Sequence, residues 1–131
     1  MSATSEKNGL AILVVDGDVL VRLTIAEYLR DCGFTVLEAA SGEEALVVLQ
    51  ADRPVDVVFS EIELPGPTDG FTLSAWVRQH RPATKMILTG TVKRAAHTAA
   101  GLCNDDGPLP KPYEPQIVLE RIRRLTGRAG E

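Results

Sequence analysis

The sequence predicts a doubly wound α/β domain, in which helices cover both faces of a parallel sheet. Short apolar runs alternate with helical patterns along the 131 residues, and each apolar run ends in polar or turn-forming residues. No linker, repeat or low-complexity block divides the chain. We therefore expect one domain at 10–126, a disordered N-terminus at 1–9 and a C-terminal tail at 127–131.

The first two strand–helix pairs have clear boundary signals. The continuous apolar run at 10–15 suits a strand buried on both faces. Asp18 is a good N-cap for the helix that follows, and Gly33 ends that helix. After a second strand at 34–39, an S-x-x-E capping box that begins at Ser41 predicts the start of the second helix.

The remaining elements continue the alternation but become less regular. They are, in chain order, a strand at 55–61, a helix at 71–80, a strand at 85–90, an Ala-rich helix at 91–101, a very short fifth strand near Leu109, and a last helix. Pro82 ends the third helix, and Pro115 suits the first turn of the last one. The stretch 102–113 is rich in turn formers, so it leaves room for only a short strand.

Composition is that of an ordinary globular protein and argues against several classes. Hydrophobic residues make up 44% of the chain, charged residues 24%, and the net charge is −4. A nucleic-acid-binding surface would favour a basic balance. No apolar run approaches the ~18 residues of a membrane span, and the N-terminus lacks an apolar signal core. We therefore expect a cytoplasmic protein with neither nucleic acid nor membrane as partner.

Polar residues follow the predicted strands at their carboxyl ends, where the working site of such a sheet lies. They are Asp16 and Asp18 after the first strand, Glu61 after the third, Thr89 after the fourth and Lys111 after the fifth. A lysine can offset the charge of a phosphoryl group, a hydroxyl can donate to its oxygens, and acids can hold Mg²⁺. The sequence therefore predicts a site suited to phosphoryl chemistry.

These residues resemble the receiver domain of bacterial two-component response regulators, over roughly residues 10–125. The resemblance rests on the segments "ILVVDGD", "VDVVFSEIELPG", "DGF", "MILTG" and "LPKPY". It implies a flavodoxin-like (βα)5 three-layer sandwich with strand order 2-1-3-4-5. It also implies a signalling module of a phosphorelay, and not an enzyme.

The resemblance also implies roles for individual residues. In that family a histidine kinase phosphorylates an Asp at the end of the third strand. Mg²⁺ is held by that Asp, by the second acid of a pair after the first strand, and by a backbone carbonyl two residues past the phosphorylated Asp. Carried over, the acid pair falls on Asp16 and Gly17, the phosphoacceptor on Glu61, the carbonyl on Glu63, and the phosphate-sensing hydroxyl and lysine on Thr89 and Lys111.

Two of these positions depart from the family in the reaction centre itself. Glu61 replaces the Asp, and Gly17 replaces the main metal-binding acid. The extra methylene shifts the carboxylate by about 1.5 Å, and in-line transfer is sensitive to displacements of about 1 Å. Asp16, Glu61 and Glu63 are thus expected to form at most a weak Mg²⁺ site, so no cofactor is expected. Pro108 also stands where the family often has an aromatic residue that moves on activation.

Three hypotheses follow. The first is an atypical pseudo-receiver that signals by protein contact, in which Glu61 pairs with Lys111 and either imitates phosphorylation or leaves the site inert. The second is a working receiver that accepts phosphate from a histidine kinase on Glu61 or another acid such as Asp16. The third, a flavodoxin-like enzyme or nucleotide binder, is disfavoured because acids flank Gly17 where a phosphate-cradling loop would be needed.

The resemblance also implies a class of partner. Receivers bind histidine kinases, phosphotransfer proteins or effectors, and we expect the contact face to comprise the helix at 91–101, the short fifth strand and the last helix. The same face can support a homodimer. Few residues follow the last helix, so we expect a stand-alone receiver or one cut from a longer protein.

Overall fold

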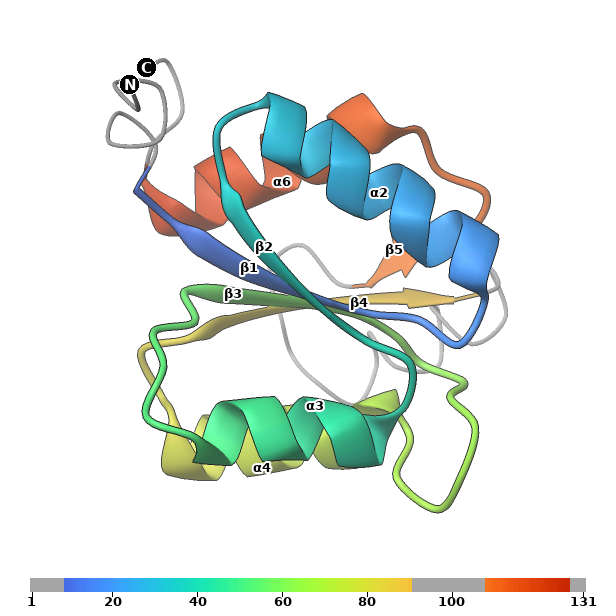
Figure 1. The fold of residues 1–131 in the computed structure, drawn as a ribbon, viewed down its shortest axis with the longest axis vertical. Coiled ribbons are helices and arrows are strands. Elements are labelled where there is room, and N and C mark those ends of the chain that lie inside the picture. The colour runs from blue at the N-terminus through green and yellow to red at the C-terminus, as the bar shows by residue number, and fades with distance from the viewer. Residues whose placement is uncertain (1–8, 91–107, 128–131) are drawn as a thin grey trace.

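The computed structural model describes residues 9–90 and 108–127 and shows a parallel sheet between two layers of helices (Figure 1). The strands are β1 (Ala11–Val15), β2 (Thr35–Ala39), β3 (Val57–Glu61), β4 (Lys85–Gly90) and β5 (Leu109–Pro110). The helices are α2 (Val19–Asp31), α3 (Gly42–Gln50), α4 (Gly70–His80) and α6 (Pro115–Thr126). The strand order β2-β1-β3-β4-β5 confirms the predicted flavodoxin-like fold and its short fifth strand.

Each face of the sheet has its own core. Figure 1 shows α2 and α6 on one face and α3 and α4 on the other. Along β1, Ile12 and Val14 belong to the core under α2 and α6, whereas Leu13 and Val15 belong to the core under α3 and α4. Because successive side chains of a strand point to opposite faces, a continuous apolar run fills both cores.

The predicted boundary signals of the first two helices are confirmed. The Asp18 carboxylate accepts the N–H groups of Leu20 and Val21 at 3.0 and 3.2 Å. Gly33 has a left-handed φ of 101° just after α2. At α3, the Ser41 hydroxyl accepts the N–H of Glu44 at 3.1 Å. The Glu44 carboxylate reaches back to the N–H of the residue before the cap at 2.8 Å.

Three boundaries further along the chain have particular local features. The third strand begins at Val57, and not at residue 55 as predicted. Just before it, the Asp56 carboxylate accepts the N–H of Ala11 at 2.8 Å. β5 is only two residues long, and Pro110 has no N–H to extend the ladder. At the end of α6, Gly127 is left-handed with a φ of 76°.

Some predictions fall on residues that the structure does not describe. The predicted helix at 91–101 lies outside the described residues, as do 1–8 and 128–131. The predicted domain limits at 10 and 126 therefore stay predictions. Within residues 9–90 and 108–127, no helix combines the length and the apolar character that crossing a membrane requires.

Candidate functional site

The carboxyl ends of four strands bring the predicted polar residues to one edge of the sheet. Asp16 follows β1 directly, Glu61 is the last residue of β3, and Lys111 follows β5. The register places Glu61 beside Thr89 of β4 and Thr89 beside Leu109 of β5. A parallel ladder thus gathers residues that lie far apart in the sequence.

An ion pair occupies the centre of this site. The Lys111 ammonium donates a hydrogen bond to Oε2 of Glu61. The side chains of Glu61 and Lys111 are 19% and 29% exposed, so the pair is partly screened from water. The pairing that the sequence suggested is therefore present, and the lysine already has a carboxylate partner.

A second carboxylate lies beside this pair. Burial raises the pKa of Glu61 above its ordinary value, the Lys111 ammonium opposes that shift, and the Asp16 carboxylate adds to it. Desolvation and a nearby like charge both disfavour the ionised form of Glu61, so both raise its pKa. One ammonium therefore faces two carboxylates at this edge.

Asp16 is held in place by its neighbours and is only 3% exposed. Its Oδ1 accepts the N–H of Asp18 at 2.8 Å. Its backbone carbonyl accepts a hydrogen bond from the Arg22 guanidinium at 2.8 Å. The Asp18 carboxylate is committed to capping α2, the role that the sequence favoured.

Two hydroxyls near the ion pair are buried and have no hydrogen-bond partner among the described residues. They are Oγ1 of Thr89 and the phenol of Tyr113. The Tyr113 ring packs edge-on against Phe59 with a centroid separation of 5.5 Å. Burial, followed by the charges of Asp16 and Glu61, raises the pKa of the phenol well above its ordinary value of 10.0. Thr89 is brought to the site but does not contact the pair through a hydrogen bond.

Sequence reasoning did not single out Tyr113. It stands two residues after Lys111, in the segment that leaves the tip of β5. Its nearness to Lys111 in the sequence is the signal that could have identified Tyr113, because a side chain two residues from a site lysine can turn toward the same edge of the sheet. Its ring packs on Phe59, which lies far away in the sequence.

The residues present do not match the magnesium set that the resemblance implies. Gly17 supplies no carboxylate, and a Cβ built there would lie 2.9 Å from Cδ of Pro65. Glu61 is engaged by Lys111. Over the part of the chain that the structure describes, no three His, Cys, Asp or Glu side chains form a group that could hold a metal ion. The carboxylates available to a metal ion at this site are therefore only those of Asp16 and Glu61 among the described residues. Glu63, two residues after Glu61, is exposed.

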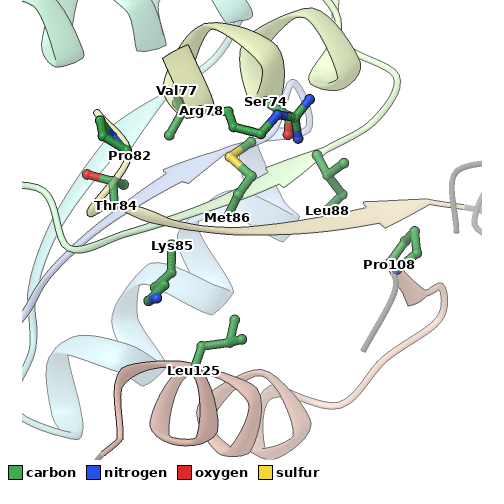
Figure 2. A pocket seen from close by; sticks show the side chains of 10 residues that line it. All are labelled: Ser74, Val77, Arg78, Pro82, Thr84, Lys85, Met86, Leu88, Pro108 and Leu125. Atoms are coloured by element: carbon green, nitrogen blue, oxygen red, sulfur yellow. The ribbon is translucent and has the colours of Figure 1, made fainter. Parts of the chain in front are cut away.

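A separate pocket of about 290 Å³ lies between α4, β4 and the end of α6 (Figure 2). Arg78, Met86, Pro108 and Leu125 are among its lining residues. Pro108 stands at the position where the family often has a mobile aromatic side chain. A proline ring fixes the backbone and cannot swing in that way. None of Asp16, Glu61, Thr89 or Lys111 is among the described residues that line this pocket.

Comparison with known proteins gives the family. Residues 12–123 match the family model of the response regulator receiver domain, and the chain belongs to that family. The predicted family and its class of function, two-component signalling, are thereby confirmed.

Individual relatives agree with this assignment. The transcriptional activator protein ExaE of Pseudomonas putida is 36% identical over 124 residues, which cover 88% of this chain and 55% of ExaE. The transcriptional regulatory protein GltR of Pseudomonas aeruginosa is 31% identical over 125 residues, which cover 93% of this chain and 51% of GltR. The chain thus spans about half the length of these two relatives.

Solved structures agree on the fold. A putative response regulator from Chloroflexus aurantiacus superposes with a TM-score of 0.76 at 33% identity, covering 91% of this chain and 98% of that one. The chemotaxis response regulator CheY4 of Vibrio cholerae gives a TM-score of 0.74 at 27% identity, with 88% and 98% covered.

Proposed function

We propose that this receiver domain signals through protein contacts and is not switched by phosphorylation at position 61. The observation that carries the proposal is the ion pair between Glu61 and Lys111. In the family, the equivalent lysine pairs with the phosphate of an activated receiver. Here its charge is already paired by a side chain of the protein itself.

The departures at the reaction centre support the same proposal. Glu61 is longer than the family's Asp by one methylene, about 1.5 Å, and its carboxylate reaches Lys111. Gly17 stands where the family has a metal-binding acid, so this chain lacks that ligand. A receiver that transfers phosphate needs both a placed acceptor and a cation near the transferred group. Both requirements are weakened in the same site.

The ion pair is also a partial imitation of the phosphorylated state. Glu61 brings one negative charge to Lys111, whereas phosphorylation adds about −1.5 to −2. The variant Glu61→Gln keeps the side-chain length and removes the charge. If the pair holds an active state, this variant loses partner binding; if the site is inert, partner binding is unchanged.

Continued phosphorylation is the alternative function. Asp16 is the other acid at the centre, but it is 3% exposed and one of its oxygens accepts the N–H of Asp18. This environment disfavours attack on an incoming phosphodonor, because the carboxylate is shielded and already hydrogen-bonded. We therefore treat phosphorylation of Glu61 or Asp16 as the outcome that would replace the proposal.

The proposal includes the class of partner. It is a histidine kinase, a phosphotransfer protein or an effector in the cytoplasm, and the protein has no catalytic activity of its own. The proposed contact face comprises the helix predicted at 91–101, β5 and α6, the first of which lies outside the described residues. Homodimerisation through the same face is part of the proposal.

Exposed apolar side chains beside the site add support for protein contact. Val19 and Leu20, in the first turn of α2, are 60% and 75% exposed. They stand directly after the loop that carries Asp16 and Gly17. Large apolar side chains gathered next to a functional edge are typical of surfaces that bind other proteins.

The decisive experiment is the intact mass of the protein after incubation with a small-molecule phosphodonor and Mg²⁺. We expect an unchanged mass, because the acceptor position is occupied by the Glu61–Lys111 pair. An ordinary receiver modified in the same buffer serves as the positive control. A species heavier by one phosphoryl group would overturn the proposal.

Variants of the chain identify the acceptor if modification occurs. Loss of the added mass in Glu61→Gln would place the phosphate on Glu61. Persistence of the added mass in that variant, with loss in Asp16→Asn, would place it on Asp16. Either result would establish the alternative function and name its acceptor.

A further inference from the structure

The outer edge of β4 is paired with β5 along only part of its length. Among the described residues, β5 pairs with the last two residues of β4 alone. The N–H of Lys85 donates to the carbonyl of Asp56, on the side of β3. Alternate residues of a strand direct their main-chain groups to alternate sides, so those of Met86 and Leu88 face away from β3. The pocket of Figure 2 lies along this edge, and both residues line it.

Two cationic side chains line this pocket from opposite sides of β4. Figure 2 shows Arg78 on the side of α4, and Lys85 on the side of α6 together with Leu125. Both cationic side chains are exposed, and neither forms an ion pair with another described residue. No Asp or Glu is among the described residues that line the pocket. The electrostatic potential of the lining therefore attracts anions.

Ser74 adds a buried hydroxyl to the same pocket. It is 4% exposed, and its hydroxyl forms no hydrogen bond with another described residue. Ser74 and Arg78 stand one turn apart on α4, and Figure 2 shows the hydroxyl beside the guanidinium group. Thr84, the other hydroxyl of the lining, donates to the carbonyl of Val55 at 2.7 Å. A buried polar group without a partner costs free energy, so a ligand oxygen that reaches Ser74 is stabilised there.

The rest of the lining is apolar. It consists of Val77, Pro82, Met86, Leu88, Pro108 and Leu125. An apolar lining with a few polar groups that fix the orientation of the ligand is typical of small-molecule sites. The volume of about 290 Å³ suits a compact molecule.

Simpler roles account for the two cations but not for Ser74. Arg78 lies in the last turn of α4, where a cation complements the helix dipole. A lysine at a strand edge, such as Lys85, discourages pairing with other chains. Neither role needs a buried hydroxyl that has no partner among the described residues. The three groups together therefore indicate a ligand.

We infer that this pocket binds a small organic anion. Ser74 and Arg78 hold its charged group by hydrogen bonds, Lys85 adds electrostatic attraction, and the apolar lining packs against the rest of the molecule. The inference goes beyond the proposed function, because the pocket shares no described lining residue with the edge that holds Glu61 and Lys111. A receiver that is not switched at position 61 thereby still has a site for a chemical input.

Phenylphosphonate is the probe that tests this inference. It joins a charged group to a compact apolar ring, and its C–P bond cannot deliver a phosphoryl group to the protein. A titration followed by amide chemical shifts should give saturable shifts at Ser74, Met86 and Leu88 in the unaltered chain. Benzyl alcohol, which has the ring but no charge, should bind about tenfold more weakly, because it cannot form a charge-assisted hydrogen bond.

Two variants identify the groups that hold the charge. Arg78→Ala should weaken phenylphosphonate binding about tenfold, because it removes one charge-assisted hydrogen bond. Gln79→Ala, at an exposed neighbouring position of the same helix, is the matched control and should leave the affinity unchanged. Ser74→Ala should also weaken binding, yet it should raise the urea midpoint of the free chain, because it removes a buried hydroxyl that has no partner among the described residues.

Several results would overturn the inference. They are the absence of saturable shifts, equal affinity for benzyl alcohol, and unchanged affinity in Arg78→Ala. Saturable shifts confined to residues around Glu61 and Lys111 would also overturn it, because they would place the anion at the other site. Phosphoryl transfer to the unaltered protein would remove the proposed function and leave this inference standing. An unchanged mass without phenylphosphonate binding would remove this inference alone.

Discussion

The two sides of the site differ in how they are filled. On the Lys111 side, an ion pair and two buried hydroxyls without partners among the described residues lie beside the two-residue strand β5. On the Gly17 side, residues of the loop at 64–69 pack closely on their neighbours: an added Cβ would lie 2.9 Å from Cδ of Pro65 at Gly17 and 2.4 Å from the carbonyl oxygen of Thr68 at Gly42. Charged and hydroxyl groups therefore lie on one side of the site, and closely packed backbone and proline atoms lie on the other. We therefore expect substitutions to act through charge on one side of the site and through steric overlap on the other.

The largest expected effect comes from adding a side chain at Gly70, on the closely packed side of the site. Its Cβ would lie 2.5 Å from one backbone oxygen and 2.8 Å from the Cα of Ile62. Overpacking of this kind costs about 3 kcal/mol, and the gain in helix propensity returns about 1 kcal/mol. Urea unfolding of Gly70→Ala is therefore expected to show a loss of about 2 kcal/mol.

The matched control for this prediction is Gln79→Ala, at an exposed position of the same helix. Its free energy of unfolding should change by less than about 0.5 kcal/mol. If Gly70→Ala were as stable as this control, the backbone at Glu61 and Ile62 would be able to shift, and the contrast between the two sides would be lost.

The next effect comes from removing the cation of the charged side. An exposed ion pair contributes about 0–1 kcal/mol, whereas removing one partner of a fully buried pair costs about 3–5 kcal/mol. The pair of Glu61 and Lys111 is 19% and 29% exposed, so Lys111→Met should cost about 1.5 kcal/mol at neutral pH. Urea unfolding measures this loss directly.

The pH dependence of this loss has a definite sign. The pKa of Glu61 is raised in the folded chain, and Lys111 opposes that rise, so Lys111→Met should raise it further. A carboxyl with a raised folded pKa contributes stability at low pH and loses it as pH rises through that pKa. The loss in free energy of unfolding caused by Lys111→Met should therefore become smaller as the pH falls from neutral to 4.5, the ordinary pKa of the Glu61 carboxyl. A deficit independent of pH, or one that persists in a Glu61→Gln background, would contradict the pair.

A smaller effect separates two buried hydroxyls at the ends of neighbouring strands. Thr89 is 1% exposed and its hydroxyl has no partner among the described residues, whereas Ser60 is 0% exposed and donates to the carbonyl of Glu61 at 2.8 Å. Thr89→Val should raise the free energy of unfolding by about 1 kcal/mol, because it removes an unsatisfied group. Ser60→Ala, the paired control, should lower it by about 1 kcal/mol. A loss of stability in both variants would show that the Thr89 hydroxyl is satisfied.

Much of the fold could be predicted because its signals are local. The apolar run at 10–15, the cap at Asp18 and the capping box at Ser41 each specify their own segment. The strand order came from the resemblance to receivers and not from these signals. The predicted start of β3 was wrong by two residues. The Asp56 side chain accepts the N–H of Ala11 just before this strand, a contact that no periodicity reveals.

The site was predicted where the topology alone determines proximity. Glu61 and Lys111 meet because Glu61 ends β3, Lys111 follows β5, and parallel strands of one sheet end at the same edge. The contact between Gly17 and Pro65 was missed because it depends on how one loop packs on another and involves no functional group. Tyr113 was missed for a similar reason, since its ring packs on Phe59, a residue far away in the sequence. Neither kind of contact leaves a pattern in the sequence.

The smallest expected effect concerns Tyr113, the second unpaired hydroxyl among the described residues of the charged side. The chain has two tyrosines. Burial raises the pKa of Tyr28, while burial and the charges of Asp16 and Glu61 raise that of Tyr113 well above its ordinary value of 10.0. A group with a raised folded pKa loses its stabilising contribution as pH rises through that pKa. The free energy of unfolding of the unaltered chain should therefore fall above pH 10.0, and that of Tyr113→Phe should fall less.

Near-ultraviolet absorbance during an alkaline titration measures this order of ionisation. We expect Tyr28 to ionise first and Tyr113 to ionise only as the chain unfolds, because the phenolate would lie unsolvated beside two carboxylates. Tyr113→Phe should remove the later step, and Tyr28→Phe, the matched control, should remove the earlier one. If both tyrosines ionised together in the folded chain near pH 10.0, the ordinary value, water would reach the Tyr113 hydroxyl. The charged side of the site would then be open, and its contrast with the packed side would be greater than the structure shows.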